Sequence, residues 1–363
     1  MSNIIRFFRF FEKNGYTNIV VQDRNAFDLS SQENTFNFFK KNQPEIVILA
    51  AGRVGGIIQN RDFPADFIHE NLSIQLNVFN AAKKYSVKKL LFFGSSCMYP
   101  SHTSQPMNEG QLGAGHPEFT SIAYASAKYM GVQMCQSINR QSGSVSFIPV
   151  IPNSVYGPND NFDLNSSHVL QALMKRFHEA KEENKPSVTL WGTGSPKREF
   201  VFVDDVVDAC LVILKEPLSS DILPINIGVG YDISIKLLAE KISEIIGYQG
   251  KIEWDKSMPD GASSKLLDSG RVESLGWKAK VNLDDGIKQL YQWYLKNNGI
   301  VISTSINKYS YITLNKLDNF FKYSYRIRYY YREERKYLNQ IKHPTIRNAL
   351  KYFKIKHKKR INY

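Results

Sequence analysis

The sequence predicts an α/β protein with a doubly wound parallel sheet. Short runs rich in Val, Ile, Leu and Phe recur along the first half of the chain, as strands covered on both faces require. The segments between them carry apolar residues at three- and four-residue spacing, which indicates amphipathic helices. Alternation of strands and helices is typical of a parallel sheet with helices on both faces.

The elements follow one another in a regular order. The predicted strands are 18–21, 45–51, 88–95 and 146–152. The predicted helices between them are 30–42, 71–85 and 124–141. Ser30 is the expected N-cap of the first helix, and Glu33 completes a capping box. After about residue 165 the pattern loosens to a helix at 168–181, a strand and turn at 188–194, and a strand followed by a helix within 198–214.

The positive charge is concentrated at the C-terminal end. Residues 301–363 hold 16 of the 47 Lys and Arg residues, 3 of the 34 Asp and Glu residues, and half of the 20 tyrosines. This basic aromatic tail therefore carries the whole net charge of +13, and residues 1–300 are neutral. Basic residues mixed with Tyr and Phe suit an anionic membrane surface, and the alternative is a solvated, partly helical extension. We do not expect nucleic acid as a partner.

The cysteines and apolar runs exclude several classes of protein. Cys97, Cys135 and Cys210 are scattered, with no CxxC and no metal-ligand spacing, so we expect no metal site and a reducing, cytoplasmic setting. No apolar run is long enough to span a membrane. Arginines interrupt the apolar N-terminus, so we expect no signal peptide.

A candidate catalytic group follows from spacing. Tyr124 and Lys128, in YASAK, lie four residues apart and share a helix face. An ammonium beside a phenol lowers the pKa of the phenol, which makes a usable proton donor and acceptor. Ser95 ends the preceding strand. Its hydroxyl is expected to form a hydrogen bond with the substrate oxygen that receives the proton from Tyr124. YxxxK alone is common on solvated helices, and the serine in a strand–helix–strand context strengthens it.

Cys97 lies two residues beyond Ser95, in the stretch FFGSSCMYP. A single cysteine at the exit of a buried strand is most often a small buried hydrophobe. The alternative is a reactive group at the carboxyl end of a parallel strand, where α/β sheets bind ligands. The residues around it leave both interpretations open.

The chain resembles the extended short-chain dehydrogenase/reductases, and in its finer motifs the GDP-L-fucose synthases (GDP-4-keto-6-deoxymannose 3,5-epimerase/4-reductases). The matching stretches are AAGRVGGI (50–57), FPADFIHENL (63–72), GSSCMYP (94–100), YASAK (124–128), PNSVYGPNDNF (152–162), NSSHVLQALMKRFHEA (165–180), WGTGSPKREFVFVDD (191–205) and PDGASSKLLD (259–268). They run in order over about residues 3–297, which makes the resemblance specific.

The resemblance implies a Rossmann-like sheet and three regions: a dinucleotide-binding domain at 1–165, a substrate-binding region at 166–300 interleaved with it, and the tail at 301–363. It implies a homodimer that uses NADPH to convert GDP-4-dehydro-6-deoxy-D-mannose into GDP-L-fucose by 3,5-epimerisation and 4-reduction. The alternative is a non-catalytic or degenerate homologue that binds a nucleotide sugar.

The resemblance also assigns roles to residues. Cys97 and His168 exchange protons at C3 and C5, since a thiol and an imidazole titrate near neutrality when perturbed. Tyr124, with Ser95 and Lys128, supplies the proton when hydride reduces C4. Without the resemblance, a histidine at a helix start is more often a cap or core group. The implied substrate-binding residues are Arg176, Trp191, Arg198 and Asp268, of which Trp191 is nearly as well explained by packing. The implied cofactor-binding residues are Arg24, Phe93, Gly94, Ser95, Ser96, Lys128, Pro152, Asn153, Ser154, Val155 and His168.

The start of the chain departs from the family pattern. Residues 1–21 align with the helix that follows the glycine-rich phosphate turn and with the second strand, so the first strand and its turn are missing. That strand lies between 18–21 and 45–51 in the family, and its loss leaves two buried strands unpaired. A shortened N-terminus, a degenerate homologue or a strand from another chain each explains this. We expect the chain from Met1 to bind NADPH weakly or not at all.

A second departure concerns the choice of cofactor. The family usually has an arginine after the second strand, where the 2′-phosphate of NADPH lies. Gln22 and Asp23 occupy this place, and Arg24 is retained. An acidic residue there favours a free ribose hydroxyl over a phosphate.

Overall fold

The computed structural model describes residues 3–13, 15–23, 27–164, 166–216, 223–258, 260–297 and 309–314. They belong to one compact unit, Met1–Asp318, and a second unit comprises Asn319–Tyr363. Arg24 and most of the basic tail lie outside the described residues, and so does the predicted membrane-binding surface. Among the described residues, no helix is both long and apolar enough to cross a membrane.

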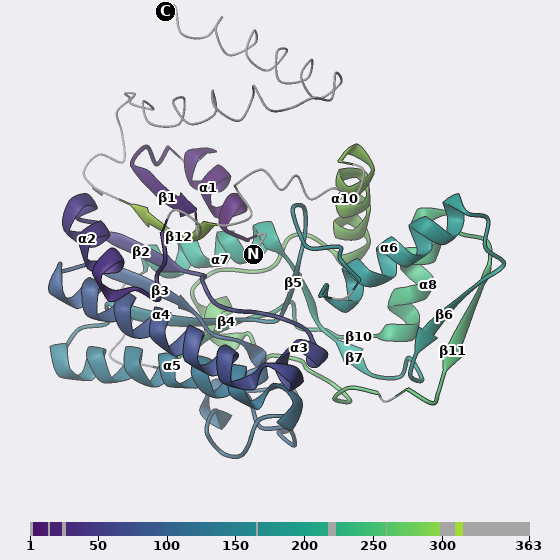
Figure 1. The fold of residues 1–363 in the computed structure, drawn as a ribbon, viewed down its shortest axis with the longest axis horizontal. Helices are drawn as coiled ribbons and strands as arrows, with labels where there is room; N and C mark the ends of the chain where they lie inside the picture. The colour runs from purple at the N-terminus through teal and green to yellow at the C-terminus, as the bar shows by residue number, and fades with distance from the viewer. Residues whose placement is uncertain are drawn as a thin grey trace, which may run out of the picture. The chain divides into compact units, whose positions relative to one another are not determined.

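A six-stranded sheet forms the centre of the first unit, in the order β1-β12-β2-β3-β4-β9 (Figure 1). Its strands are β1 (Ile19–Asp23), β2 (Ile46–Leu49), β3 (Lys89–Phe93), β4 (Phe147–Pro152), β9 (Ile225–Ile227) and β12 (Tyr309–Leu314). The strands β2, β3, β4 and β9 pair in parallel. Their side chains are almost all buried, which confirms the interpretation of the continuous apolar runs as strands covered on both faces.

Helices cover both faces of this sheet (Figure 1). One face carries α1 (Asn3–Lys13) and α7 (Val203–Lys215), and the other carries α2 (Gln32–Asn42), α4 (Pro64–Lys84) and α5 (Ile122–Ser142). Alternate strand residues divide between the two cores: Ile48 and Leu91 pack with Phe7 of α1, whereas Val47 and Leu90 pack on the opposite side. The predicted doubly wound α/β fold is therefore confirmed.

The start of α2 differs from the prediction by one residue. Ser31, not Ser30, is the N-cap, and its Oγ accepts a hydrogen bond from the amide of Asn34 at 3.3 Å. The Ser30 hydroxyl instead donates to the carboxylate of Asp28, with Oγ 2.7 and 2.8 Å from its two oxygens. The proposed capping box with Ser30 is therefore wrong, because Asp28 competes for that hydroxyl.

The strand β12 fills the place in the sheet where we expected a missing partner. It is antiparallel to both β1 and β2, with Ile312 opposite Val21 on one side and Ile48 on the other. Residues 309–314 therefore belong to the sheet, which corrects the view of 301–363 as wholly an appendage. Two features explain this pairing. The facing edges of β1 and β2 carry backbone groups that need partners inside a sheet, and the sequence of β12, YSYITL, is rich in residues that favour strands.

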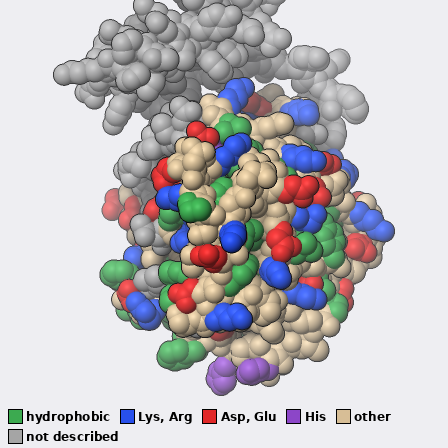
Figure 2. All heavy atoms as spheres, turned by 90° about the vertical axis from the view of Figure 1, so that its right-hand side faces the viewer, with side chains coloured by type: hydrophobic (Ala, Val, Ile, Leu, Met, Phe, Trp, Pro, Cys, Tyr) green, Lys and Arg blue, Asp and Glu red, His purple; other side chains and the backbone are tan. Residues whose placement is uncertain are grey.

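The second lobe is a smaller α/β region that follows β4 (Figure 1). Its helices are α6 (Val169–Glu182), α8 (Ile235–Ile246) and α10 (Leu283–Lys296). Its strand pairs are β6 (Ser187–Trp191) with β11 (Lys251–Asp255), β5 (Ser154–Tyr156) with β8 (Phe200–Phe202), and β7 (Lys197–Arg198) with β10 (Ile233–Ser234). These elements enclose a core of their own around Phe177, Ile242 and Ile287. On the face shown in Figure 2, acidic and basic side chains alternate, as expected for the neutral body.

The remaining short elements lie in connections. They are the helices α3 (Ile57–Asp62) and α9 (Gly270–Ser274) and the 3-10 turns Ser96–Met98, Glu109–Gln111 and Phe119–Ser121. The turn Ser96–Met98 follows β3 directly and brings the predicted catalytic residues to the carboxyl edge of the sheet.

Candidate active site

Ser95 connects the end of β3 to the first turn of the site. It is the N-cap of the turn Ser96–Met98, and its Oγ accepts a hydrogen bond from the amide of Cys97 at 3.2 Å. The Ser95 side chain also interacts with the Tyr124 side chain, and this interaction lowers the pKa of Tyr124 in part. The structure therefore brings Ser95, Cys97 and Tyr124 together, as the motifs predicted.

Lys128 lies one turn beyond Tyr124 on α5 and is 3 % exposed. Its Nζ donates a hydrogen bond to the carbonyl oxygen of Phe93 at 2.8 Å and lies 6.0 Å from the centre of the Tyr124 ring. Burial lowers the pKa of Lys128 to about 8, because the charged form loses its hydration. An ammonium with three donors is thus held at the end of β3.

The expected lowering of the Tyr124 pKa is not found. Burial raises the pKa of Tyr124 above the usual range, the nearby Cys97 raises it further, and the interaction with the Ser95 side chain lowers it in part. The main cause is desolvation of the phenolate. Among the described contacts, Nζ of Lys128 lies near the face of the Tyr124 ring and donates no hydrogen bond to the Tyr124 hydroxyl. Tyr124 is therefore held in the protonated form that a proton donor needs.

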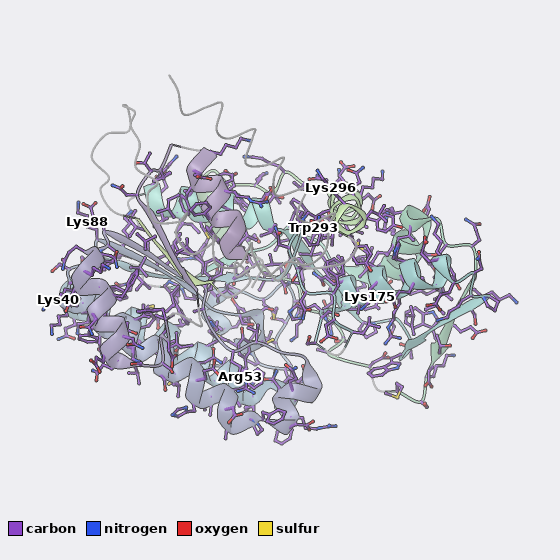
Figure 3. The ribbon with its side chains drawn as sticks, turned by 45° about the horizontal axis from the view of Figure 1, so that its top comes forward. Lys40, Arg53, Lys88, Lys175, Trp293 and Lys296 are labelled. Atoms are coloured by element: carbon purple, nitrogen blue, oxygen red, sulfur yellow. The ribbon has the colours of Figure 1, made fainter. Side chains whose placement is uncertain are left out.

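Phe67 supports Tyr124 from α4. The two rings meet edge to face with their centres 6.4 Å apart, and the guanidinium of Arg53 lies 5.1 Å from the centre of the Phe67 ring. Arg53, labelled in Figure 3, is within 3.3 Å of Asp66 and 3.5 Å of Glu70. Arg53 follows β2, Phe67 lies on α4, and Tyr124 lies on α5. The contact of these three residues was not identified from sequence, because they belong to separate motifs.

Cys97 differs from the other two cysteines in its accessibility. Cys97 is partly exposed, whereas Cys135 and Cys210 are buried, and burial raises the pKa of both buried thiols. The Cys97 sulfur lies 3.7 Å from Nζ of Lys265. These contacts favour the interpretation of Cys97 as a reactive group over that of a buried hydrophobe.

His168 and two of the predicted substrate ligands lie in the second lobe. His168 is the exposed N-cap residue of α6, Arg176 lies on the same helix, and Trp191 ends β6 with 58 % exposure. Burial raises the pKa of the nearby Asp160, and the charge of His168 opposes this rise. No contact among the described residues joins His168 to Cys97, so their pairing across a sugar ring stays a prediction.

Arg198 and Asp268 are held mainly by the backbone. Nη1 of Arg198 donates to the carbonyl oxygens of Lys197 at 2.6 Å and Ala262 at 2.7 Å, and burial lowers the pKa of Arg198. Oδ1 of Asp268 accepts from the amide of Gly270 at 2.9 Å. Both positions are fixed without a ligand, and their role in substrate binding stays a prediction.

The predicted cofactor residues follow the ends of two adjacent parallel strands. Residues 93–96 end β3, and residues 152–155 end β4 and begin β5. The hydroxyl of Ser96 joins them by donating to Oδ1 of Asn153 at 3.1 Å. At Gly94 an added Cβ would come within 2.8 Å of the terminal methyl group of Met98, so a larger residue would have to displace the Met98 side chain.

A second observation fits a ligand at this edge. Gly52 follows β2, and an added Cβ there would lie 2.5 Å from Oδ1 of Asn71 and 3.5 Å from Nζ of Lys128. That Asn71 oxygen is buried and accepts no hydrogen bond in the described part of the chain. Donors and acceptors beside a bare backbone suit the ribose and amide groups of a nicotinamide nucleotide.

Glu199 is a further buried group that sequence reasoning missed. Its Oε2 accepts from Nδ2 of Asn153 at 2.7 Å and from the amide of Leu267 at 3.0 Å. Its Oε1 accepts from the amides of Val229 at 2.6 Å and Gly230 at 2.9 Å. Burial raises the pKa of Glu199, and these four donors lower it in part. Glu199 thus links Asn153, one of the predicted cofactor-binding residues, to Leu267 in the PDGASSKLLD segment.

We expect Glu199→Gln to destabilise the protein although the two side chains have the same shape. All four partners are donors, so the amide group of glutamine must face at least one donor without an acceptor. A lost buried partner costs about 1–3 kcal/mol, and more at a charged group. Glu240→Gln, at an exposed position on α8, is the control. Equal melting temperatures of the two variants would contradict this role of Glu199.

Comparison with protein families decides the affiliation. The model of the NAD dependent epimerase/dehydratase family matches residues 6–228. The chain belongs to this family. The match thus covers every strand of the main sheet except β12, together with the Ser95–Tyr124–Lys128 group and part of the second lobe.

Curated relatives include GDP-L-fucose synthase 1 of Arabidopsis thaliana, 48 % identical over 79 % of this chain and 88 % of the relative. The GDP-L-fucose synthase of Escherichia coli K12 is 41 % identical over 79 % and 91 % of the two chains. A solved GDP-L-fucose synthetase from Naegleria fowleri bound to NADP is 26 % identical, with a TM-score of 0.75 over 82 % of this chain and 91 % of that chain. These similarities bear out the family resemblance seen in the motifs.

Proposed function

We propose that this protein converts GDP-4-dehydro-6-deoxy-D-mannose into GDP-L-fucose by 3,5-epimerisation and NADPH-dependent 4-reduction. The observation that carries the proposal is the contact of Ser95 with both Cys97 and Tyr124 at the end of β3. A donor for ketone reduction and a thiol for proton exchange thus share one edge. This arrangement disfavours a non-catalytic binding protein, because binding alone needs neither group.

The proposed epimerisation uses two groups on opposite faces of the sugar ring. The 4-keto group acidifies the hydrogens on C3 and C5. Cys97 as thiolate removes the proton, and His168 returns one from the other face. Cys97 follows β3 and His168 precedes α6 in the second lobe, so the proposal requires the sugar ring to bind between these two elements.

The proposed reduction uses Tyr124 as proton donor. The raised pKa keeps the phenol protonated, Ser95 orients its hydroxyl, and Lys128 adds positive charge beneath the ring. NADPH, when bound, supplies the hydride for C4. Lys128 and residues 93–96 and 152–155 are the residues proposed to hold it, with His168 and Arg24. Asp23 is the feature that weighs toward NADH, and the NADP-bound relative weighs toward NADPH.

Arg176, Trp191, Arg198 and Asp268 are the proposed ligands of the GDP-sugar. An arginine suits the diphosphate because its planar fork binds two oxygens at once. The electrostatic interaction of Arg198 with Cys97 supports a place for Arg198 close to the reacting sugar.

Two further proposals concern partners and location. Exposed apolar side chains on α4 and α5, among them Leu76 and Met130, support a homodimer through this face. The charge of residues 301–363 supports an anionic membrane surface as a partner of the tail. The three free thiols fit a cytoplasmic location.

Cys97→Ser should reduce proton exchange at C3 and C5 by about 10²–10⁴-fold, the usual contribution of a general base. Binding of NADPH should change little, since the substitution removes no proposed cofactor contact. Exchange is measured by NMR in deuterated water, and binding by nicotinamide fluorescence. Exchange at the wild-type rate in the variant would exclude Cys97 as the base and leave the proposed epimerisation without its first step.

A further inference from the structure

Lys265 is the cation nearest to the Cys97 sulfur in the described contacts. Its Nζ lies 3.7 Å from Sγ of Cys97, within the range of a hydrogen bond to sulfur. The same Nζ lies 4.0 Å from Oε2 of Glu118. The Lys265 side chain is 20 % exposed and that of Glu118 31 %, so this pair is partly shielded from water and its charges are less screened than surface charges.

The backbone around Lys265 is fixed by three consecutive hydrogen bonds. The carbonyl oxygen of Lys265 accepts from Nδ2 of Asn153 at 2.7 Å. The next amide, of Leu266, donates to Oε1 of Gln105 at 2.7 Å, and that of Leu267 donates to Glu199. A lysine on so constrained a segment loses less side-chain and backbone entropy on holding one contact, and its ammonium is directed at Cys97.

The groups around Cys97 carry both positive and negative charge. Lys265 and Arg198 supply positive charge, and Glu118 interacts with both cations. Tyr124 and Ser95 face it from α5 and from the end of β3. Since Tyr124 is held protonated, the cations are the groups that can offset a negative charge on the sulfur.

We propose that Lys265 is a positioning residue for the proton exchange, holding the Cys97 thiolate by a charge-assisted hydrogen bond. The inference rests on the proposed function, because that function requires Cys97 to act as a base. When Cys97 takes the proton from C3 or C5, the C–H bond breaks, an S–H bond forms, and the electron pair moves to the 4-keto oxygen as an enolate. Lys265 keeps its own protons throughout.

Alkylation of Cys97 tests this without substrate or cofactor. Iodoacetamide reacts with the thiolate, and peptide mass spectrometry separates Cys97 from the buried Cys135 and Cys210. In Lys265→Met we expect alkylation at neutral pH to be about tenfold slower, because the ammonium group 3.7 Å from the sulfur no longer stabilises the thiolate that reacts. Lys265→Arg should keep most of the wild-type rate. Lys288→Met, at an exposed position on α10, should leave it unchanged.

The outcomes separate this proposal from others. A Lys265→Met variant with the wild-type alkylation rate overturns it, and a raised KM for the GDP-sugar with that same rate assigns Lys265 to the diphosphate instead. A slowed alkylation in both the Met and the Arg variant, with lowered melting temperatures, overturns it in favour of a purely structural role. If the wild-type protein shows no exchange at C3 and C5, the proposed function fails, while the alkylation result still decides the contact between Lys265 and Cys97.

Discussion

A chain shortened by residues 309–363 should be unfolded or barely stable, whereas a chain shortened by residues 319–363 should melt as the intact protein does. The first deletion removes β12 from between β1 and β2, and the second leaves the whole first unit, Met1–Asp318, in place. Each backbone group left unpaired inside the sheet costs about 1–3 kcal/mol. Several such groups equal the whole stability of a typical domain, about 5–15 kcal/mol.

A point substitution separates the strand from the length of the chain. Ile312 lies opposite residues of both neighbours, so Ile312→Pro removes a ladder donor from an interior strand, where proline is not tolerated. Ile312→Val keeps the donor and the preference for strand, and it is the control. Circular dichroism melts of all four variants are the measurement. If Ile312→Pro and the longer deletion both melt with the wild type, β12 is not a working part of the sheet.

The same pair of deletions bears on the tail. An appendage that comprised all of residues 301–363 would be dispensable for the fold, but the position of β12 limits the dispensable part to residues 319–363. The shorter deletion is therefore the correct variant for testing binding to anionic liposomes. Binding should weaken with salt, since the Debye length falls from about 10 Å at 0.1 M to about 3 Å at 1 M.

The sequence predicted the features that depend on local pattern. The apolar runs of β2, β3 and β4 and the helices between them were found because burial on both faces and helical periodicity are visible in a short window. The contact of Ser95 with Tyr124 was found because both follow from one strand–helix unit. The strand β12 was not found, since its pairing joins residues about 290 apart in sequence and no window reveals such a partner.

Burial and long-range polar contacts also escaped prediction. The four-residue spacing of Tyr124 and Lys128 suggested a lowered phenol pKa, but spacing does not reveal that the site is desolvated. The residues next to Glu199 and Lys265 in sequence do not indicate their partners. Glu199 binds Asn153, and Lys265 contacts Cys97. Their places within WGTGSPKREFVFVDD and PDGASSKLLD were the available signal, since a charged residue inside a matched motif invites a search for its partner.

Tyr124→Phe should lower the rate of ketone reduction by about 10²–10⁴-fold, the range that a positioned general acid contributes. Proton exchange at C3 and C5 should continue, because Cys97 keeps its sulfur and its contacts with Ser95 and Lys265. Tyr129→Phe removes a hydroxyl from the same helix outside the Ser95 contact and is the matched control. Reduction is followed by the loss of NADPH absorbance and exchange by NMR.

The pH dependence of reduction gives this prediction its sharpest form. Burial raises the pKa of Tyr124 and lowers that of Lys128 to about 8. As the pH rises through 8, Lys128 loses its charge while Tyr124 stays protonated, so the wild-type rate of reduction should fall there through loss of the cation beside the developing phenolate. In Lys128→Met, the remaining slow reduction should lack that step. A fall near pH 8 that persists in this variant would assign the titration to another group, and undiminished reduction in Tyr124→Phe would remove Tyr124 as the proton donor.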